Sequence, residues 1–508
     1  MIEELAAVRL LAPSFGDSAP VWTNVIAAIL LALALGSALG GRLADRGLGP
    51  VLLPSFLGIA GAGTFLAPFL VPRISSWLLP PDLPLDQALP LLIKGSLGVS
   101  LLVFSPPVLF AGAVPPLLIR LGSREASVGR VSGLVYASGT IGSLSGTFLA
   151  THVFVPLLGL SATFGLAGGL LLLAGLFSLT RLRGGFKVFL LLLPPGATLW
   201  IPPPRPPWIG PGEKILEVKD STYQRLWVVE GNDSENSGPY RKLCINEGLD
   251  SYQSFHRPGR AFTGGRYYDA FALLPPALGR GPVRALSLGC ATGSILRAVA
   301  ATAGESMEGI GVELDPDVLT LGRRFFGTEE LESGGRIRFL GGVDARFYLQ
   351  QASRKRVLFD LILLDTYRNQ IYLPPHLCTR EFFLLAKSRL AKRGIFACNV
   401  GDLLAGGPVL RAVASTLATV FPTVESLGIP GSRNFLLAGS SGPPGSIARA
   451  LRRRSRPEGF PSSLWERALR GGAWRLHRPT PSEPVLTDDR APILLLQERA
   501  YMRGRGEG

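Results

Sequence analysis

The sequence predicts a multi-span α-helical membrane region, then a small β-domain, then an α/β Rossmann-like domain. Two observations predict this order. The first two hundred residues are apolar and poor in acids, whereas the chain after residue 280 alternates short apolar strands with helices. We therefore expect a membrane-spanning helical region at 1–205, a small β-strand domain at 206–265 and a nucleoside-binding catalytic domain at 266–508.

Five apolar runs in the N-terminal region are long enough to cross a bilayer, which takes about 20 apolar residues. They are Val21–Leu39, Val51–Val71, Leu91–Ile119, Val131–Leu160 and Ala162–Leu179. A sixth run, Phe186–Ile201, is shorter and has two prolines in its middle, so we expect a re-entrant or surface segment. If this run crosses instead, the catalytic domain lies outside. Ionisable residues are scarce within the runs, which favours an anchor over a pump.

The net charge of +15 is placed as in a membrane protein, not as in a nucleic-acid-binding protein. Basic residues follow the first, third and fifth runs: Arg42 and Arg46; Arg120, Arg124 and Arg130; Arg181, Arg183 and Lys187. This alternation is the positive-inside pattern. It predicts a multi-pass protein of the cell (inner) membrane with a cytoplasmic catalytic domain. Whether a further span precedes the given sequence is left open.

A proline-rich link at 201–214 separates the membrane region from the rest of the chain. Beyond it, we expect short strands at 215–220, 225–231 and 240–248, with a turn at 231–239. These strands form the small β-domain.

A turn of small residues follows the buried strand Ala285–Leu288. Gly289, Ala291 and Gly293 precede a helix that starts near Ser294, and Glu313 stands 24 positions after Gly289. Small residues let the backbone approach a nucleotide, and an acid at this distance hydrogen-bonds ribose hydroxyls in dinucleotide-type folds. The alternative is a unit whose glycines serve only tight packing.

The α/β alternation continues to the C-terminal region. We expect strands at 336–342, 359–366 and 394–401, with a helix at 380–393. The runs 423–429 and 434–441 predict a closing antiparallel pair. The result is a doubly wound sheet, which binds ligands at the carboxyl ends of its strands.

Three acids stand at those strand ends: Glu313, Asp344 and Asp365. One such acid is often a helix cap, but three on one edge favour a shared ligand. Asp344 could accept a hydrogen bond from an adenine amino group, and Asp365 could act as general base or hold a cationic substrate. The four cysteines and four histidines show no metal-ligand spacing, so we expect no metal.

The chain resembles the spermidine synthase (polyamine aminopropyltransferase) family, and its apolar half resembles the bacterial membrane-bound members. The stretches that carry this resemblance are DSTYQRLWVVEG from Asp220, INEGLDSYQS from Ile245, RYYDAFALLPP from Arg266, VELDPDV from Val312, VDARFYL from Val343, LLDT from Leu363 with LCTREFF after it, and TDDRAP from Thr487.

The resemblance implies a fold of the class I S-adenosylmethionine-dependent methyltransferase type and the ligand decarboxylated S-adenosylmethionine. Glu313 would then meet the ribose and Asp344 the adenine, while Asp365 would deprotonate the attacking amine. Gln224, Gln253 and Tyr268 match family positions at the cofactor cleft.

Two departures concern the acceptor. Thr292 stands where the family has an aspartate in its glycine turn, and Arg368 replaces a second aspartate three places after Asp365. A cation repels a cationic acceptor by roughly 1 to 4 kcal/mol at about 4 Å. Putrescine therefore fits poorly. Tyr367 and Arg368 could instead meet an anionic or neutral acceptor, or Arg368 could pair with Asp365 and lower its basicity.

We expect a membrane-anchored transferase that moves an aminopropyl group to an amine. One alternative is a methyltransferase that uses S-adenosylmethionine itself, and another is a non-catalytic membrane binding or transport protein. The expected partners are a small-molecule amine acceptor and the lipid bilayer, with no nucleic acid. A homodimer and the role of Asp488 and Asp489 are left open.

Overall fold

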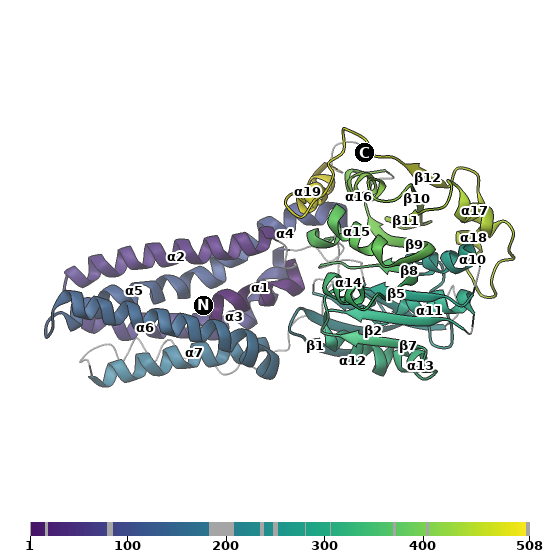
Figure 1. Ribbon diagram of the computed structural model, residues 1–508. Helices are drawn as coiled ribbons and strands as arrows, with labels where there is room; N and C mark the ends of the chain where they lie inside the picture. Colours follow the sequence, from purple (N-terminus) through teal and green to yellow (C-terminus); the bar gives the residue numbers. More distant parts are fainter. Residues whose placement is uncertain are drawn as a thin grey trace. The chain divides into compact units, whose positions relative to one another are not determined.

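The chain forms two compact units, which Figure 1 draws in sequence colours. One contains Met1–Ile209 and Lys219–Arg225, and the other contains Gly210–Val218 and Leu226–Gly508. The computed structural model describes residues 2–15, 19–78, 85–181, 208–233, 238–246, 252–279, 281–304, 306–368, 372–402 and 406–503.

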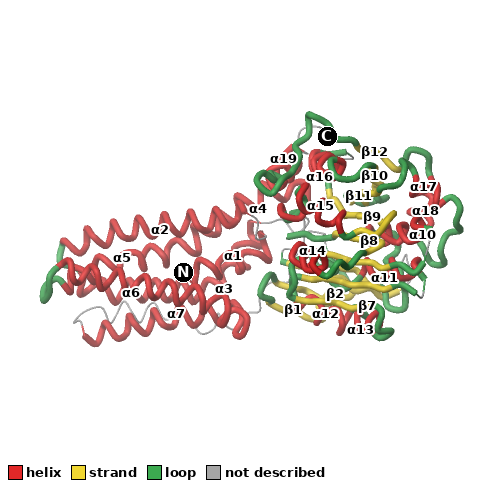
Figure 2. The backbone as a smooth tube through the Cα atoms, viewed as in Figure 1, coloured by secondary structure: helices red, strands yellow, loops and turns green. Residues whose placement is uncertain are grey.

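The N-terminal unit is built from helices (Figure 2). They are α1 (Ile2–Phe15), α2 (Ala19–Asp45), α3 (Gly49–Leu78), α4 (Leu85–Val99), the π-helix η1 (Ser100–Phe104), α5 (Ser105–Gly122), α6 (Val128–Leu149), the π-helix η2 (Ala150–Phe154) and α7 (Val155–Arg181). Within the described residues, four stretches are long and apolar enough to cross a membrane: Pro20–Asp45, Gly49–Leu78, Leu91–Gly122 and Leu157–Leu179.

Glycines allow the helices of this unit to pack closely. A Cβ added at Gly61 of α3 would lie 2.8 Å from the carbonyl oxygen of Gly168 on α7, and one at Gly168 would lie 2.6 Å from that of Gly61. Neither distance leaves room for a methyl group. The close approach of these two backbones follows the small-residue packing that membrane helices use.

The fourth expected span, Val131–Leu160, is not among the four apolar helices. The structure folds it as α6, η2 and the start of α7. Its first part, VSGLVYASGTIGSLSGTFL, alternates apolar residues with Gly, Ser and Thr, which lower its mean hydropathy. The sixth run and the link up to residue 207 lie outside the described residues.

A small sheet precedes the α/β part. Its strands are β1 (Lys214–Asp220), β2 (Arg225–Asp233), β3 (Gly238–Ile245) and β4 (Ser254–His256), in that order. Leu226, Val228 and Leu243 are fully buried and belong to one cluster with Val318 and Leu321 of α12. Strand β4 was not predicted from the sequence, and residues 234–237 of the expected turn lie outside the described residues.

The large sheet has the order β12-β10-β11-β9-β8-β5-β6-β7. Its strands are β5 (Arg284–Leu288), β6 (Glu308–Glu313), β7 (Ile337–Gly341), β8 (Phe359–Leu364), β9 (Leu390–Gly401), β10 (Thr423–Gly428), β11 (Asn434–Ser440) and β12 (Trp474–His477). β7, β6, β5, β8 and β9 are parallel, and β11, β10 and β12 continue antiparallel. The predicted fold class, including the closing antiparallel pair, is confirmed.

Helices cover both faces of this sheet. They are α9 (Tyr267–Ala270), the 3-10 helix η4 (Phe271–Leu273), α10 (Leu274–Leu278), α11 (Ser294–Ala303), α12 (Pro316–Phe325), α13 (Thr328–Glu332), α14 (Ala345–Arg354), the 3-10 helix η5 (Pro375–Leu377), α15 (Arg380–Ser388), α16 (Pro408–Ala418), α17 (Ser446–Leu451), α18 (Ser462–Leu469) and α19 (Ile493–Arg503).

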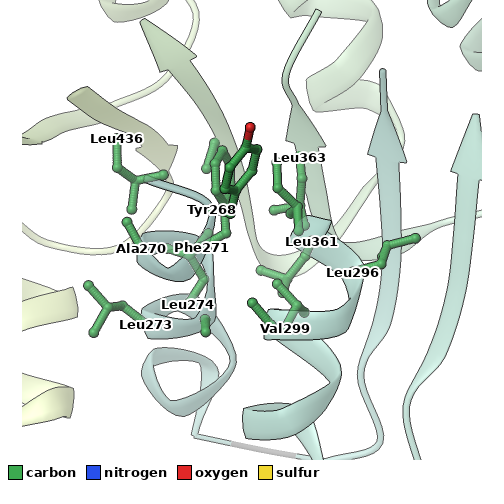
Figure 3. Close-up of a cluster of buried hydrophobic side chains, with 14 of the residues drawn as sticks. Tyr268, Ala270, Phe271, Leu273, Leu274, Leu296, Val299, Leu361, Leu363 and Leu436 are labelled. Atoms are coloured by element: carbon green, nitrogen blue, oxygen red, sulfur yellow. The ribbon is translucent and has the colours of Figure 1, made fainter. Parts of the chain in front are cut away.

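Strand β8 shows why two core clusters form. Leu361 and Leu363 belong to the cluster that contains Phe271 (Figure 3), whereas Ile362 and Leu364 belong to the other cluster. Successive strand residues face opposite sides of a sheet, so a strand buried on both faces has an unbroken apolar sequence. The central strands are therefore held rigidly, and their carboxyl ends are fixed points for side chains.

One expectation for the C-terminal part was wrong, and one strand was not predicted. The helix expected at 380–393 ends at Ser388, because β9 begins at Leu390. The unpredicted strand is β12, which pairs antiparallel with β10 at the sheet edge. Only four residues long and with two of them exposed, β12 has too little apolar pattern to be recognised.

Candidate active site

The small-residue turn connects β5 to α11 and requires glycine at two positions. Gly289, Ala291 and Gly293 all have positive φ, at 72°, 44° and 93°. A Cβ at Gly289 would clash with the carbonyl oxygen of Asp365, and one at Gly293 would lie 2.8 Å from the ring of Phe339. Because these two positions have no side chain, the turn can lie against the end of β8 and against the ring of Phe339 on β7.

The turn is also tied to β4. The backbone N–H of Thr292 donates to Ser254 Oγ at 3.1 Å, and Ser294 Oγ donates to the carbonyl oxygen of Phe255 at 3.0 Å. Thr292 is buried. Gln253 directly precedes β4, and its backbone N–H donates to the carbonyl oxygen of Leu243 at 2.8 Å. Its role at the cofactor cleft stays a prediction.

Asp365 follows β8 and is joined to three neighbouring elements. Its backbone N–H donates to the carbonyl oxygen of Leu288, at the end of β5. Asn399 of β9 donates from Nδ2 to Oδ1 at 3.0 Å, and the Tyr267 hydroxyl donates to Oδ2 at 3.0 Å. Burial raises the pKa of Asp365 from 3.8 to about 6, although both hydrogen bonds oppose this.

Glu313 ends β6 and contacts the turn directly. Its Oε2 accepts from the backbone N–H of Ala291 at 2.9 Å, and its Oε1 accepts from that of Asp315 at 3.1 Å. Burial raises the pKa of Glu313 to about 7 despite these bonds. A carboxylate held here can accept hydrogen bonds from vicinal hydroxyls, as a ribose offers.

Asp344 lies beyond β7 and caps α14. Its Oδ1 accepts from the backbone N–H groups of Arg346 and Phe347, both at 2.9 Å. Its Oδ2 lies 3.2 Å from Nε2 of His376. The contact with His376 and the helix cap hold the pKa of Asp344 below its usual value. The cap, weighed as an alternative for each acid, is thus real at Asp344 but uses only one oxygen.

Tyr267 and Tyr268 have different partners. Tyr267 reaches Asp365, whereas the Tyr268 hydroxyl donates to the carbonyl oxygen of Tyr252 at 2.9 Å. Their rings lie 4.0 Å apart, between centroids. Tyr268 is fully buried in the core cluster (Figure 3), so its place beside the cofactor stays a prediction.

The two residues expected on the acceptor side are held differently. The Tyr367 hydroxyl donates to the carbonyl oxygen of Asn399 at 3.1 Å and accepts from the backbone N–H of Gly401 at 2.7 Å. Arg368 is exposed and forms a backbone bridge with Tyr372. The suggested pairing of Arg368 with Asp365 stays a prediction, as does the contact of Tyr367 and Arg368 with an acceptor.

Gln224 belongs to the turn between β1 and β2, where its backbone N–H donates to Ser221 Oγ at 3.0 Å. Direct contacts join the glycine turn with Glu313 and with Asp365. Asp344 and His376 lie further along the same edge of the sheet and contact each other. The role of Gln224 at the cleft stays a prediction.

Sequence reasoning missed three residues at this edge: Tyr267, His376 and Asn399. Asn399 was detectable, because it is the polar residue near the end of the apolar strand GIFACNVG, the position that singled out the acids. Tyr267 and His376 lie on other segments, and only tertiary packing brings them to Asp365 and Asp344.

No family model matches the chain. A stretch of 118 residues is 36% identical to a polyamine aminopropyltransferase of Vibrio vulnificus (strain CMCP6), covering 23% of this chain and 38% of that relative. The chain thus spans well under half the length of the curated relative it matches. The resemblance to the spermidine synthase family is confirmed over this stretch.

Solved structures that match part of this chain include spermidine synthases and a methyltransferase. Spermidine synthase from Thermotoga maritima is 18% identical, with a TM-score of 0.37, over 50% of this chain and 84% of its own. A probable spermidine synthase from Corynebacterium glutamicum ATCC 13032 is 21% identical, with a TM-score of 0.36, over 53% and 99%. Human methyltransferase-like protein 13 in complex with SAH is 22% identical, with a TM-score of 0.29, over 38% and 95%.

Proposed function

We propose that this chain is a membrane-anchored transferase of the spermidine synthase type. It moves an aminopropyl group from decarboxylated S-adenosylmethionine to an amine acceptor. The observation that carries the proposal is Asp365, a partly buried carboxylate with a raised pKa, held by Asn399 and Tyr267 against a glycine turn. The partial identity to a polyamine aminopropyltransferase supports it.

The residues fit a sulfonium nucleoside as substrate. The turn at Gly289 offers backbone without a side chain, Glu313 suits the ribose hydroxyls, and Oδ2 of Asp344 suits the adenine amino group. These groups stand on adjacent strands in the order β8, β5, β6, β7, so one extended ligand can meet them in turn. The enzyme uses no metal in this proposal.

Asp365 acts on the acceptor amine. The amine nitrogen attacks the methylene carbon next to the sulfonium, the new C–N bond forms, and the C–S bond breaks with its electron pair on sulfur. Methylthioadenosine leaves, and Asp365 takes the proton that the nitrogen loses. Asn399 and Tyr267 orient the carboxylate, while its burial strengthens it as a base.

We further propose an acceptor other than putrescine. Arg368 and the buried Thr292 stand where acids would hold a second ammonium group. A monoamine, or an amine that also bears an anionic group, avoids repulsion from the Arg368 guanidinium. The four apolar helices support an anchor in the cell membrane. The alternation of basic residues between the apolar runs favours a cytoplasmic catalytic part.

The test is calorimetric titration of the full chain in detergent with decarboxylated S-adenosylmethionine, S-adenosylmethionine and methylthioadenosine. We expect preference for the decarboxylated ligand. Glu313→Ala should abolish it, whereas Glu308→Ala, an exposed acid at the other end of β6, should not. An acceptor screen by mass spectrometry should then yield methylthioadenosine, at a rate about 10²- to 10⁴-fold lower in Asp365→Asn.

Other outcomes would replace the proposal. Preference for S-adenosylmethionine, with S-adenosylhomocysteine and a methylated product, would identify a methyltransferase. A folded chain that binds none of the three nucleosides would identify a membrane binding or transport protein.

A further inference from the structure

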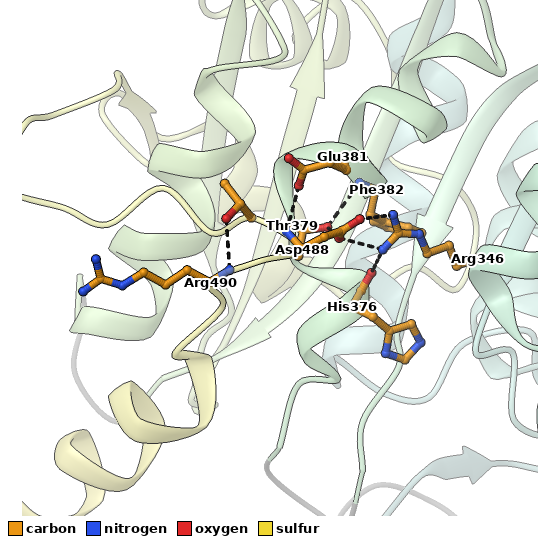
Figure 4. Close-up of polar contacts among 8 residues, drawn as sticks. Arg346, His376, Thr379, Glu381, Phe382, Asp488 and Arg490 are labelled. Atoms are coloured by element: carbon orange, nitrogen blue, oxygen red, sulfur yellow. Dashed lines mark hydrogen bonds and ion pairs between the residues drawn. The ribbon is translucent and has the colours of Figure 1, made fainter.

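The acidic stretch TDDRAP forms a turn that contacts Arg346 of α14 and Glu381 of α15 (Figure 4). The turn closes on itself, since the backbone N–H of Thr487 donates to the carbonyl oxygen of Arg490 at 3.0 Å. Leu486, directly before it, is fully buried, and its carbonyl oxygen accepts from the backbone N–H of Arg380 on α15. The turn is therefore anchored, and it presents Asp488.

Asp488 is held by four contacts with two helices. Arg346 of α14 binds both carboxylate oxygens, Nη1 to Oδ1 at 2.7 Å and Nη2 to Oδ2. The Thr379 hydroxyl, which caps α15, donates to Oδ1 at 2.7 Å, and Glu381 accepts from the Asp488 backbone N–H at 3.0 Å. Bidentate arginine–carboxylate pairs fix direction as well as distance, so this carboxylate orients Arg346.

Arg346 also links Asp488 to His376, which contacts Asp344. Its Nη1 also donates to the carbonyl oxygen of His376 at 3.2 Å, as Figure 4 shows. The imidazole of His376 in turn meets Oδ2 of Asp344 at 3.2 Å. The other oxygen of Asp344 is occupied by the α14 cap. His376 therefore fixes the one oxygen that a ligand can use.

We propose that Asp488 is a positioning residue for nucleoside binding, which acts through Arg346 and His376 to hold Oδ2 of Asp344 for the adenine amino group. This inference rests on the proposed function, because it takes Asp344 as the adenine acceptor. The chain of contacts joins three segments that are far apart in sequence, around residues 344, 376 and 488. Asp488, the first aspartate of TDDRAP, therefore has a positioning role. Among the contacts described for this turn, its exposed neighbour Asp489 takes part in none of those that reach Arg346 or Thr379.

The test measures binding of methylthioadenosine and methylthioinosine to the full chain in detergent. Methylthioinosine lacks the adenine amino group, so it does not use the Asp344 acceptor. We expect Asp488→Asn to weaken methylthioadenosine binding about three- to tenfold, as for a partly exposed but bidentate pair, and to leave methylthioinosine almost unchanged. Arg346→Gln should behave in the same way, and Asp489→Asn is the matched control.

Coupling to Asp344 separates positioning from general stability. In an Asp344→Asn chain, the further change Asp488→Asn should have no effect on either nucleoside. Unchanged methylthioadenosine affinity in Asp488→Asn, equal losses for both nucleosides, or additive losses in the double variant would each overturn the inference alone. No binding of methylthioadenosine by the unmodified chain would overturn the proposed function together with it.

Discussion

The raised pKa of Asp365 makes the free energy of unfolding depend on pH. Burial raises its pKa from 3.8 to about 6, so between these values the folded state binds more protons than the unfolded state. The stability that this group contributes is fully present below about pH 4 and is lost as the pH rises through about 6. A carboxylate kept basic for catalysis therefore destabilises the resting protein at neutral pH.

Asp365→Asn should make the chain more stable at pH 7.5, because an amide cannot ionise. A pKa difference of about two units corresponds to at most about 3 kcal/mol, and we expect about 1 to 3. Thermal unfolding in detergent should show a higher midpoint for the variant at pH 7.5 and equal midpoints at pH 4. The exposed Asp489→Asn is the control, and a lower midpoint at pH 7.5 would contradict the prediction.

The sequence predicted those site residues that the order of strands alone identifies. Glu313, Asp344 and Asp365 were found because parallel strands end at one edge, and each indeed ends or follows a strand of the large sheet. Their partners were not predictable in this way. Tyr267 and His376 meet them only after distant segments pack, and no local pattern marks which of two adjacent tyrosines will reach the carboxylate.

At the scale of elements, long apolar periodic segments were predicted and short or mixed ones were not. The parallel strands were recognisable because both of their faces are buried. β4 and β12 were missed because three or four residues carry no periodicity, and α15 was extended too far because its continuation, LAKR, is equally compatible with a helix. α6 was predicted within the expected span Val131–Leu160, although its small and hydroxyl residues lower its mean hydropathy.

The contact between α3 and α7 offers a matched pair of glycines. Gly168→Ala would place a methyl group 2.6 Å from the backbone of Gly61, whereas a Cβ at the adjacent Gly169 meets nothing within 4 Å. We expect Gly168→Ala to destabilise the helical unit by roughly 1 to 3 kcal/mol through overpacking. Gly169→Ala should be neutral or more stable by up to about 1 kcal/mol, since it only gains helix propensity.

Thermal unfolding of both variants in detergent measures the difference. Because the two substitutions change the same helix by the same atoms, a different midpoint reports the contact with α3. Equal midpoints would mean that α3 and α7 do not pack through these glycines.

At the scale of the whole molecule, charge and hydropathy give different numbers of spans. Four described helices are apolar enough to cross a membrane, and four crossings would put the loop after α2 and the end of α7 on opposite sides. Both sites are basic. Arg42 and Arg46 stand at the end of α2, and the end of α7 has Arg181, followed in the sequence by Arg183 and Lys187. The positive-inside rule therefore requires one more crossing, and α6 is the helix that can supply it.

We accordingly predict that α6 crosses the membrane and that the catalytic part is cytoplasmic. A reporter enzyme that is active only after export should be inactive when fused after Trp208 or after Ser127, and active when fused after Trp77, at the end of the second span. Activity after Trp208 together with inactivity after Ser127 would mean an odd number of crossings between these two positions. The prediction that both α6 and α7 cross the membrane would then be wrong. A cytosolic nucleoside substrate would then be out of reach, so this one fusion bears on the proposed chemistry as well as on the topology.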